Sequence, residues 1–99
     1  MIKEFIYKKF VDKVLSHMRI TSDDLFERSK EKHLVIGRHL LFLLCNERGM
    51  SDREIQKYLE RSNFKIDLPS IRYGINKAKE IRKQDQDFDN IFLNLNEID

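Results

Sequence analysis

Six residues in one short stretch of the sequence have the side chains that proteins use to bind duplex DNA. Arginine and asparagine present paired hydrogen-bonding groups that match the edges of guanine and adenine, and serine most often contacts a phosphate. Lysine either clamps a phosphate or remains in water, and aspartate either faces the bases or only caps its helix. The candidate DNA-contacting residues are Asp67, Ser70, Arg72, Tyr73, Asn76 and Lys77.

A helix that begins near Asp67 would arrange these side chains along one surface. Asp67 can accept from the first backbone amides, and Pro69 falls in the first turn, where its missing N–H costs nothing. We expect this helix to run from about Leu68 to Lys83, with the candidate residues outward or sideways. The residues expected to face the core are Ile71, Ile75, Ala78 and Ile81.

A second helix start lies upstream of the first. Gly49 can end a preceding helix, and Ser51 and Glu54 have the spacing of a capping box, in which each side chain binds the other residue's backbone amide. The helix that follows is expected over residues 52–61, with Ile55, Tyr58 and Leu59 inward. Two short helices in succession indicate a helix-turn-helix, whose second helix reads the major groove.

The net charge of +2 conceals an uneven distribution along the chain. Residues 28–83 contain fourteen Lys or Arg and seven Asp or Glu, whereas residues 84–99 contain five acidic residues and no basic one. A basic segment fits a surface that faces phosphates, although solvated helix faces often carry the same excess. Arg28, Lys30 and Lys32 lie in a charged connection without apolar periodicity and are further candidate DNA contacts.

The rest of the chain also has a helical pattern, since only one Pro and three Gly occur in 99 residues. Further helices are expected at about residues 2–18, within residues 20–26 after a cap, at about residues 30–48, and from near residue 87. The prediction is a single all-α domain over residues 1–99 with six helices. Its further core residues are Ile2, Phe5, Ile6, Phe10, Val14, Met18, Leu34, Leu40, Leu41, Leu44, Cys45, Phe88, Ile91, Phe92 and Leu95.

Several other classes of protein are disfavoured by the sequence. The longest apolar run, residues 40–45, is far shorter than a membrane span, and the mixed charges of the first turns are unlike a signal peptide. The single cysteine, Cys45, predicts a core position in a reducing, cytoplasmic compartment. His17, His33 and His39 lack metal-ligand spacing, and no nucleotide-binding or catalytic motif occurs. We therefore expect no metal, no cofactor and no enzymatic activity.

The order of these elements resembles the C-terminal DNA-binding domain of the bacterial replication initiator DnaA, over nearly the full length of the chain. Residues 20–25 (ITSDDL) resemble a turn of that family, residues 38–47 (RHLLFLLCNE) its central helix, and residues 51–55 (SDREI) its S-L-P-E-I motif. Arg28, Lys30 and Lys32 fall where the family has a basic loop. The resemblance implies that this loop contacts the backbone and minor groove, while the helix from Leu68 enters the major groove.

The chain departs from the family where the second helix begins. The family signature reads G-G-R-D-H-T-T-V, and Asp67, Ser70 and Ile71 match its Asp, second Thr and Val. Leu68 and Pro69 replace its His and first Thr, two polar residues that help to read bases in the family, and the preceding turn is longer. The target sequence of the family is therefore not carried over to this chain.

These observations predict a small protein that binds double-stranded DNA in replication or transcription control, in a bacterium or a phage-infected host. A phage or another mobile element would suit such a free-standing module. The alternative is a helical interaction or structural module without DNA binding, which Leu68 and Pro69 favour. An exposed-looking apolar pair, Phe64 and Ile66, and the acidic segment 84–99 are candidate contacts for a protein partner.

Overall fold

The computed structural model describes residues 2–98, which form six helices and no strand. This finding confirms the all-α prediction and most of the expected helix bounds. The central helix begins at Lys32 rather than near Lys30, because Ser29 and Glu31 form a local turn in which the Glu31 amide donates to Ser29 Oγ over 3.1 Å. The helices are α1 (Ile2–Met18), α2 (Ser22–Leu25), α3 (Lys32–Glu47), α4 (Asp52–Arg61), α5 (Leu68–Gln84) and α6 (Gln86–Leu95).

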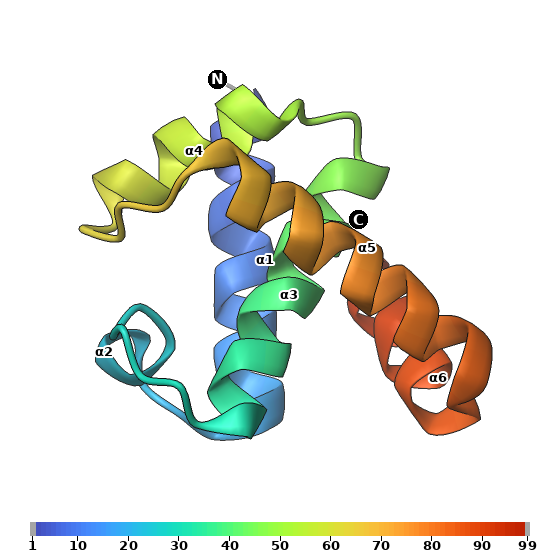
Figure 1. The fold of residues 1–99 in the computed structure, drawn as a ribbon. Coiled ribbons are helices and arrows are strands. Elements are labelled where there is room, and N and C mark those ends of the chain that lie inside the picture. The colour runs from blue at the N-terminus through green and yellow to red at the C-terminus, as the bar shows by residue number, and fades with distance from the viewer. Residues whose placement is uncertain (1, 99) are drawn as a thin grey trace.

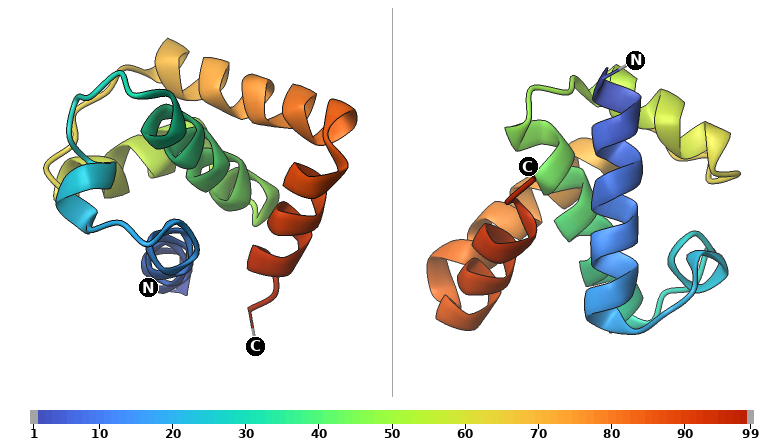
Figure 2. Two further views of the ribbon diagram at one scale, coloured as in Figure 1. Left: turned by 90° about the horizontal axis from the view of Figure 1, so that it is seen from below. Right: turned by 180° about the vertical axis from the view of Figure 1, so that it is seen from behind.

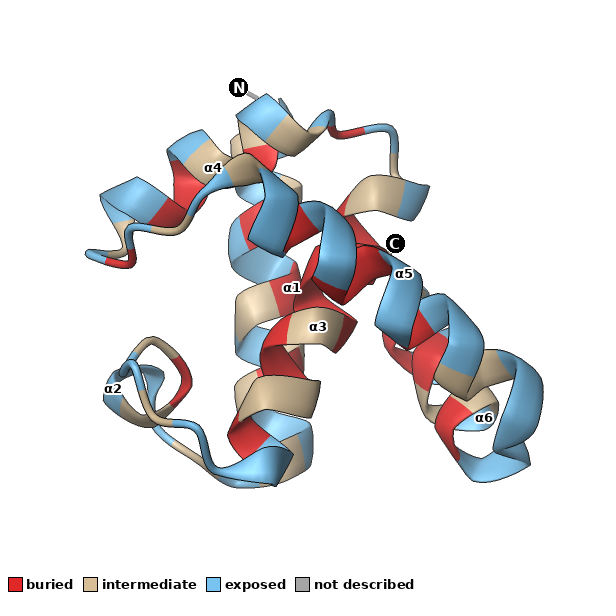
Figure 3. Cartoon of the chain, in the orientation of Figure 1, coloured by how far each residue is buried: buried red, intermediate tan, exposed pale blue. Residues whose placement is uncertain are grey.

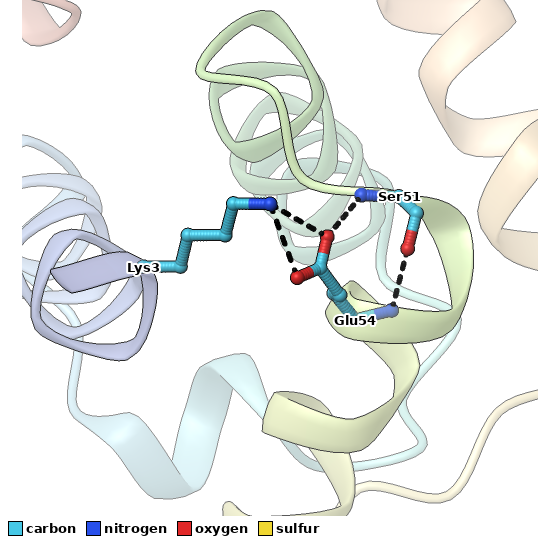
Figure 4. Close-up of polar contacts among 3 residues, drawn as sticks. All are labelled: Lys3, Ser51 and Glu54. Atoms are coloured by element: carbon cyan, nitrogen blue, oxygen red, sulfur yellow. Dashed lines mark hydrogen bonds and ion pairs between the residues drawn. The ribbon is translucent and has the colours of Figure 1, made fainter. Parts of the chain in front are cut away.

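The helix starts predicted at Ser51 and Asp67 are confirmed. The Glu54 amide donates to Ser51 Oγ over 3.1 Å, and the Ser51 amide donates to Glu54 Oε1 over 2.9 Å (Figure 4). Lys3 of α1 donates to both oxygens of the same carboxylate, at 3.1 and 3.2 Å, so the cap also links α4 to α1. At the start of α5, the Ser70 amide donates to Asp67 Oδ1 over 2.9 Å.

The central helix α3 lies between α1 and α5 (Figures 1 and 2). This position explains why every residue from 40 to 45 is apolar, since helices contact α3 on opposite sides and all six residues are buried. Buried side chains from all six helices join one core. Cys45 lies inside this core as expected, and burial raises the pKa of its thiol. Within residues 2–98, no helix combines the length and apolar character that crossing a membrane requires.

The predicted apolar stripe of α1 is wrong at its first turns. Ile2 is 78% exposed and Phe5 is 57% exposed, whereas Phe10 and Val14 are fully buried. Tyr7 takes the place expected for Phe5: it is buried, and its hydroxyl lies 3.0 Å from Ser62 Oγ. Successive helix residues are about 100° apart, so Phe5 points to nearly the opposite side from Tyr7. The buried face of α1 therefore starts at Tyr7 and leaves two large apolar side chains outside.

The prediction that Phe64 is exposed is also wrong. Its side chain is 5% exposed and packs against the ring of Phe26, with the two centroids 6.1 Å apart. The guanidinium groups of Arg28 and Arg38 lie 5.7 and 5.4 Å from the centre of the Phe64 ring. Ile66 is half-buried. These two residues attach the α4–α5 turn to the domain and do not form an open apolar surface.

The acidic C-terminal segment folds back onto the domain. Phe88 and Phe92 of α6 are buried, as expected, and α6 contacts α5, α1 and α3. Arg82 of α5 donates to Asp89 over 2.7 Å and lies 3.9 Å from the centre of the Phe92 ring. The aromatic side chains of this segment are therefore buried within the chain, whereas Leu93 of α6 is 50% exposed.

Candidate nucleic-acid interface

A groove lies between the α2–α3 connection and the first turns of α5. It has a volume of about 680 Å³. Arg28 and Lys30 line it from the connection, and Pro69, Ser70 and Tyr73 line it from α5. Residues that the sequence predicted to contact DNA from two distant segments therefore lie around one opening.

The α2–α3 connection is held in place by Arg38 of α3. Arg38 is 7% exposed and donates to three backbone carbonyl groups, those of Leu25 at 2.9 Å, Glu27 at 3.0 Å and Ser29 at 2.7 Å. Burial lowers the pKa of its guanidinium. Because one planar guanidinium binds the carbonyl groups of three alternate residues from the end of α2 into the connection, it sets where Arg28 and Lys30 lie relative to α5.

The three predicted residues of the basic connection lie in different surroundings. Arg28 donates to the carbonyl of Lys65 and lies over the Phe64 ring, so it joins the connection to the α4–α5 turn. Lys30 and Lys32 are exposed, and the side chain of neither makes a hydrogen bond or ion pair with another residue of the described chain. Of this group, the two lysines are therefore the ones able to bind a phosphate without first breaking a contact.

Exposed stretches alternate with buried ones along α5 (Figure 3). Its outward side carries Ser70, Tyr73, Asn76 and Lys77, all exposed as predicted. The Tyr73 ring meets the ring of His39 edge-on, with the two centroids 6.0 Å apart. Lys77 Nζ lies 5.9 Å from the centre of the Tyr73 ring. Lys77 is also 3.6 Å from a carboxylate oxygen of Glu80, on the same helix. These contacts orient Tyr73 at the edge of the groove.

The two remaining candidates are engaged by other parts of the fold. Asp67 caps α5, and the hydrogen bonds from the Ser70 side chain and amide lower the pKa of its carboxyl group. Arg72 forms an ion pair with Asp52 at the start of α4, at 2.6 Å. The sequence indicated the cap, but it gave no indication that Arg72 and Asp52 would meet.

His39 lies between the groove and the body of the domain. Its ring is half-buried beside Phe42 and Tyr73, with centroid distances of 6.1 and 6.0 Å. Burial lowers the pKa of His39, and the positive charges of Arg38 and Lys77 lower it further. His39 is therefore held neutral in the fold over a range of pH where a free histidine begins to take up a proton.

Replacing His39 with glutamine is expected to reduce the loss of stability on acidification between about pH 6.5 and pH 5. Because the pKa of His39 is lower in the folded chain than its ordinary value of 6.5, the unfolded chain binds more protons in this range. The free energy of unfolding therefore falls as the pH falls, and glutamine removes this contribution. Urea titrations at several pH values measure it. If His33→Gln, at an exposed position, changed the pH dependence equally, the explanation would fail.

Two structural residues of the interface were not among the sequence predictions. Arg38 holds the residue before Lys30 through its hydrogen bond to the Ser29 carbonyl, and Asp52 accepts two hydrogen bonds from Arg72. A signal for Arg38 was present, because it is spaced four residues from Leu34 and from Phe42 on the buried side of α3.

Neither a metal site nor a relative adds to this picture. In the part of the chain that the structure describes, no group of three or more His, Cys, Asp or Glu residues is placed to hold a metal ion. Comparison of the chain with protein-family models, with curated proteins and with solved structures finds no match.

Proposed function

We propose that this chain binds double-stranded DNA through α4, α5 and the α2–α3 connection. In this arrangement α5 lies in the major groove, with Ser70, Tyr73 and Asn76 directed at base edges and phosphates. Lys30 and Lys32 contact the backbone or the adjacent minor groove.

The observation that carries this proposal is the groove between the α2–α3 connection and α5. It brings Lys30 beside Ser70 and Tyr73 of a helix whose outward side also bears Asn76 and Lys77. A helix that presents polar and basic side chains next to a second basic segment offers both base contacts and phosphate contacts. The buried Arg38 fixes that second segment, so the arrangement exists before any ligand binds.

The resemblance of the sequence to the C-terminal domain of DnaA supports the same proposal. That resemblance carries the biological part of it: a bacterial or phage protein of replication or transcription control that acts in the cytoplasm. Leu68 and Pro69, where the family has polar residues, limit the resemblance to the type of binding and exclude transfer of the target sequence.

The double variant Lys30→Ala, Lys32→Ala is expected to weaken binding to a mixed-sequence duplex and to reduce its dependence on salt. Each phosphate contact contributes about 0.9 to the slope of log K against log salt, so the slope should fall by up to about 2. Fluorescence anisotropy with a labelled duplex at about 50 to 200 mM salt measures both effects.

The matched control is Lys8→Ala, Lys9→Ala, which removes the same charge from exposed positions on α1. This control variant should retain most of the affinity and the salt slope of the unmodified chain. Equal losses in the two double variants would mean that only net charge matters, and the proposed geometry would be wrong.

A protein-interaction module is the second candidate function, and the exposed start of α1 favours it. Ile2 and Phe5 are large apolar side chains that remain 78% and 57% exposed, and Lys9 Nζ lies 5.4 Å from the centre of the Phe5 ring. A chain that is retained neither on heparin nor on duplex DNA at low salt would support this function over DNA binding.

A further inference from the structure

Arg72 is a candidate base-contacting residue that a carboxylate of another helix holds through two hydrogen bonds. Its Nε donates to Asp52 Oδ2 over 3.0 Å, and its Nη2 donates to Asp52 Oδ1 over 2.6 Å. Asp52 is the first residue of α4, where the positive end of the helix stabilises its negative charge. The pair therefore links the start of α4 to the outward side of α5.

This geometry uses only one edge of the guanidinium group. A guanidinium has five N–H donors, and the two bonds to Asp52 take the edge formed by Nε and Nη2. The other edge, formed by Nη1 and the second N–H of Nη2, has no partner among residues 2–98. The Arg72 side chain as a whole is 45% exposed. We infer that this second edge, which Asp52 does not cover, is open to a ligand. Its two parallel donors match two neighbouring acceptors.

The geometry points to Arg72, held by Asp52, as the residue that reads one guanine in the major groove. Guanine presents O6 and N7 there as adjacent acceptors, and paired donation from arginine is the commonest specific contact to a base. Arg72 also lies in the first turns of α5, where a helix in the major groove meets base edges. This inference rests on the proposed binding of duplex DNA.

A phosphate is a poorer ligand for this pair than a base edge. Asp52 already neutralises the charge of Arg72, so the pair has little net attraction for phosphate. The pair still offers a guanidinium in a fixed orientation, because the carboxylate limits its rotation and determines where the free edge points. Lys77 and Lys79, further along α5, have positive charge suited to the backbone.

The test begins with selection of bound sequences from a random duplex pool by the unmodified chain, by Arg72→Lys and by Asp52→Asn. The ion pair is partly exposed, so both variants should remain folded, which thermal melts check. The lysine variant keeps the charge and lacks the two parallel donors. The asparagine variant keeps the size and loses the second acceptor for the guanidinium.

The selected duplex is then bound with each guanine replaced in turn by 7-deazaguanine, which pairs normally and lacks the N7 acceptor. At one guanine, this replacement should weaken the unmodified chain about tenfold and weaken Arg72→Lys less, because a lysine ammonium lacks the fixed parallel donors that Asp52 orients. In Asp52→Asn, the loss of affinity caused by 7-deazaguanine at this position should be several-fold smaller than in the unmodified chain. This variant should bind unrelated duplexes at least as well as the unmodified chain, because it lacks one negative charge.

Four outcomes would overturn the inference. If the unmodified chain binds duplex DNA without a guanine preference, or if both variants keep the same preference, Arg72 does not read a base and the proposed function stands. If no 7-deazaguanine position separates the unmodified chain from Arg72→Lys, the contact is not to guanine. If the unmodified chain binds no duplex, the proposed function and this inference fail together.

Discussion

Replacing Arg38 with alanine is expected to lower the free energy of unfolding by about 3 kcal/mol or more. The guanidinium donates to the carbonyl groups of Leu25, Glu27 and Ser29, which the substitution leaves without this donor. It also removes the group that lies 5.4 Å from the centre of the buried Phe64 ring, and the space beside that ring becomes a cavity. Urea denaturation followed by circular dichroism measures the change.

The matched control is Arg53→Ala. Arg53 is an exposed arginine of α4 whose side chain makes no hydrogen bond or ion pair within residues 2–98, so its loss should cost less than about 0.5 kcal/mol. Arg38→Lys separates charge from geometry, because a single ammonium group cannot span three carbonyl groups. We expect it to be nearly as unstable as Arg38→Ala. A loss in Arg38→Ala no larger than in Arg53→Ala would show that the connection does not depend on this side chain.

The helix starts were predictable because the interactions that make them are local. Ser51 and Glu54 are three residues apart, and so are Asp67 and Ser70, so their hydrogen bonds depend on short segments alone. The outward orientation of the α5 side chains followed from the spacing of its apolar residues, and the structure confirms it. The all-α architecture follows from such patterns added along the chain.

The incorrect predictions concern side chains whose burial depends on segments that are distant in the sequence. Phe64 lies among polar residues and looks like a surface residue, but Phe26, Arg28 and Arg38 enclose it from elsewhere in the chain. The start of α1 has apolar residues on more than one side, and its own periodicity does not show that Tyr7 faces the core. Only the packing of the whole domain resolves these cases.

The candidate interface was predictable in composition and not in arrangement. The types and positions of Lys30, Ser70 and Tyr73 were visible in the sequence, whereas their meeting around one groove depends on how the helices pack. The ion pair of Arg72 and Asp52 joins residues twenty positions apart on two helices. No periodicity within either helix encodes that contact, because it depends on the angle between them.

Substituting valine for Gly74 is expected to lower the free energy of unfolding by about 3 kcal/mol. Gly74 of α5 faces α3, and a Cβ atom at this position would lie 2.6 Å from His39 Cδ2 and 2.8 Å from Phe42 Cδ2. Both distances are too short for carbon atoms, so the rings or the helices must move apart. Chemical denaturation measures the cost. Gly74→Ala should cost less, because alanine favours the helix over glycine by about 1 kcal/mol.

Two further variants decide whether the close approach of the helices causes this loss. Lys79→Val introduces the same side chain at an exposed position of α5, so it measures the effect of valine on the helix alone and should be small. His39→Ala removes one of the two rings, so Gly74→Ala should cost less in that background than in the unmodified chain. Equal costs in both backgrounds would mean that the His39 ring moves freely. Since the same ring contacts Tyr73, a displaced α5 would also change the side of the groove that we propose meets DNA.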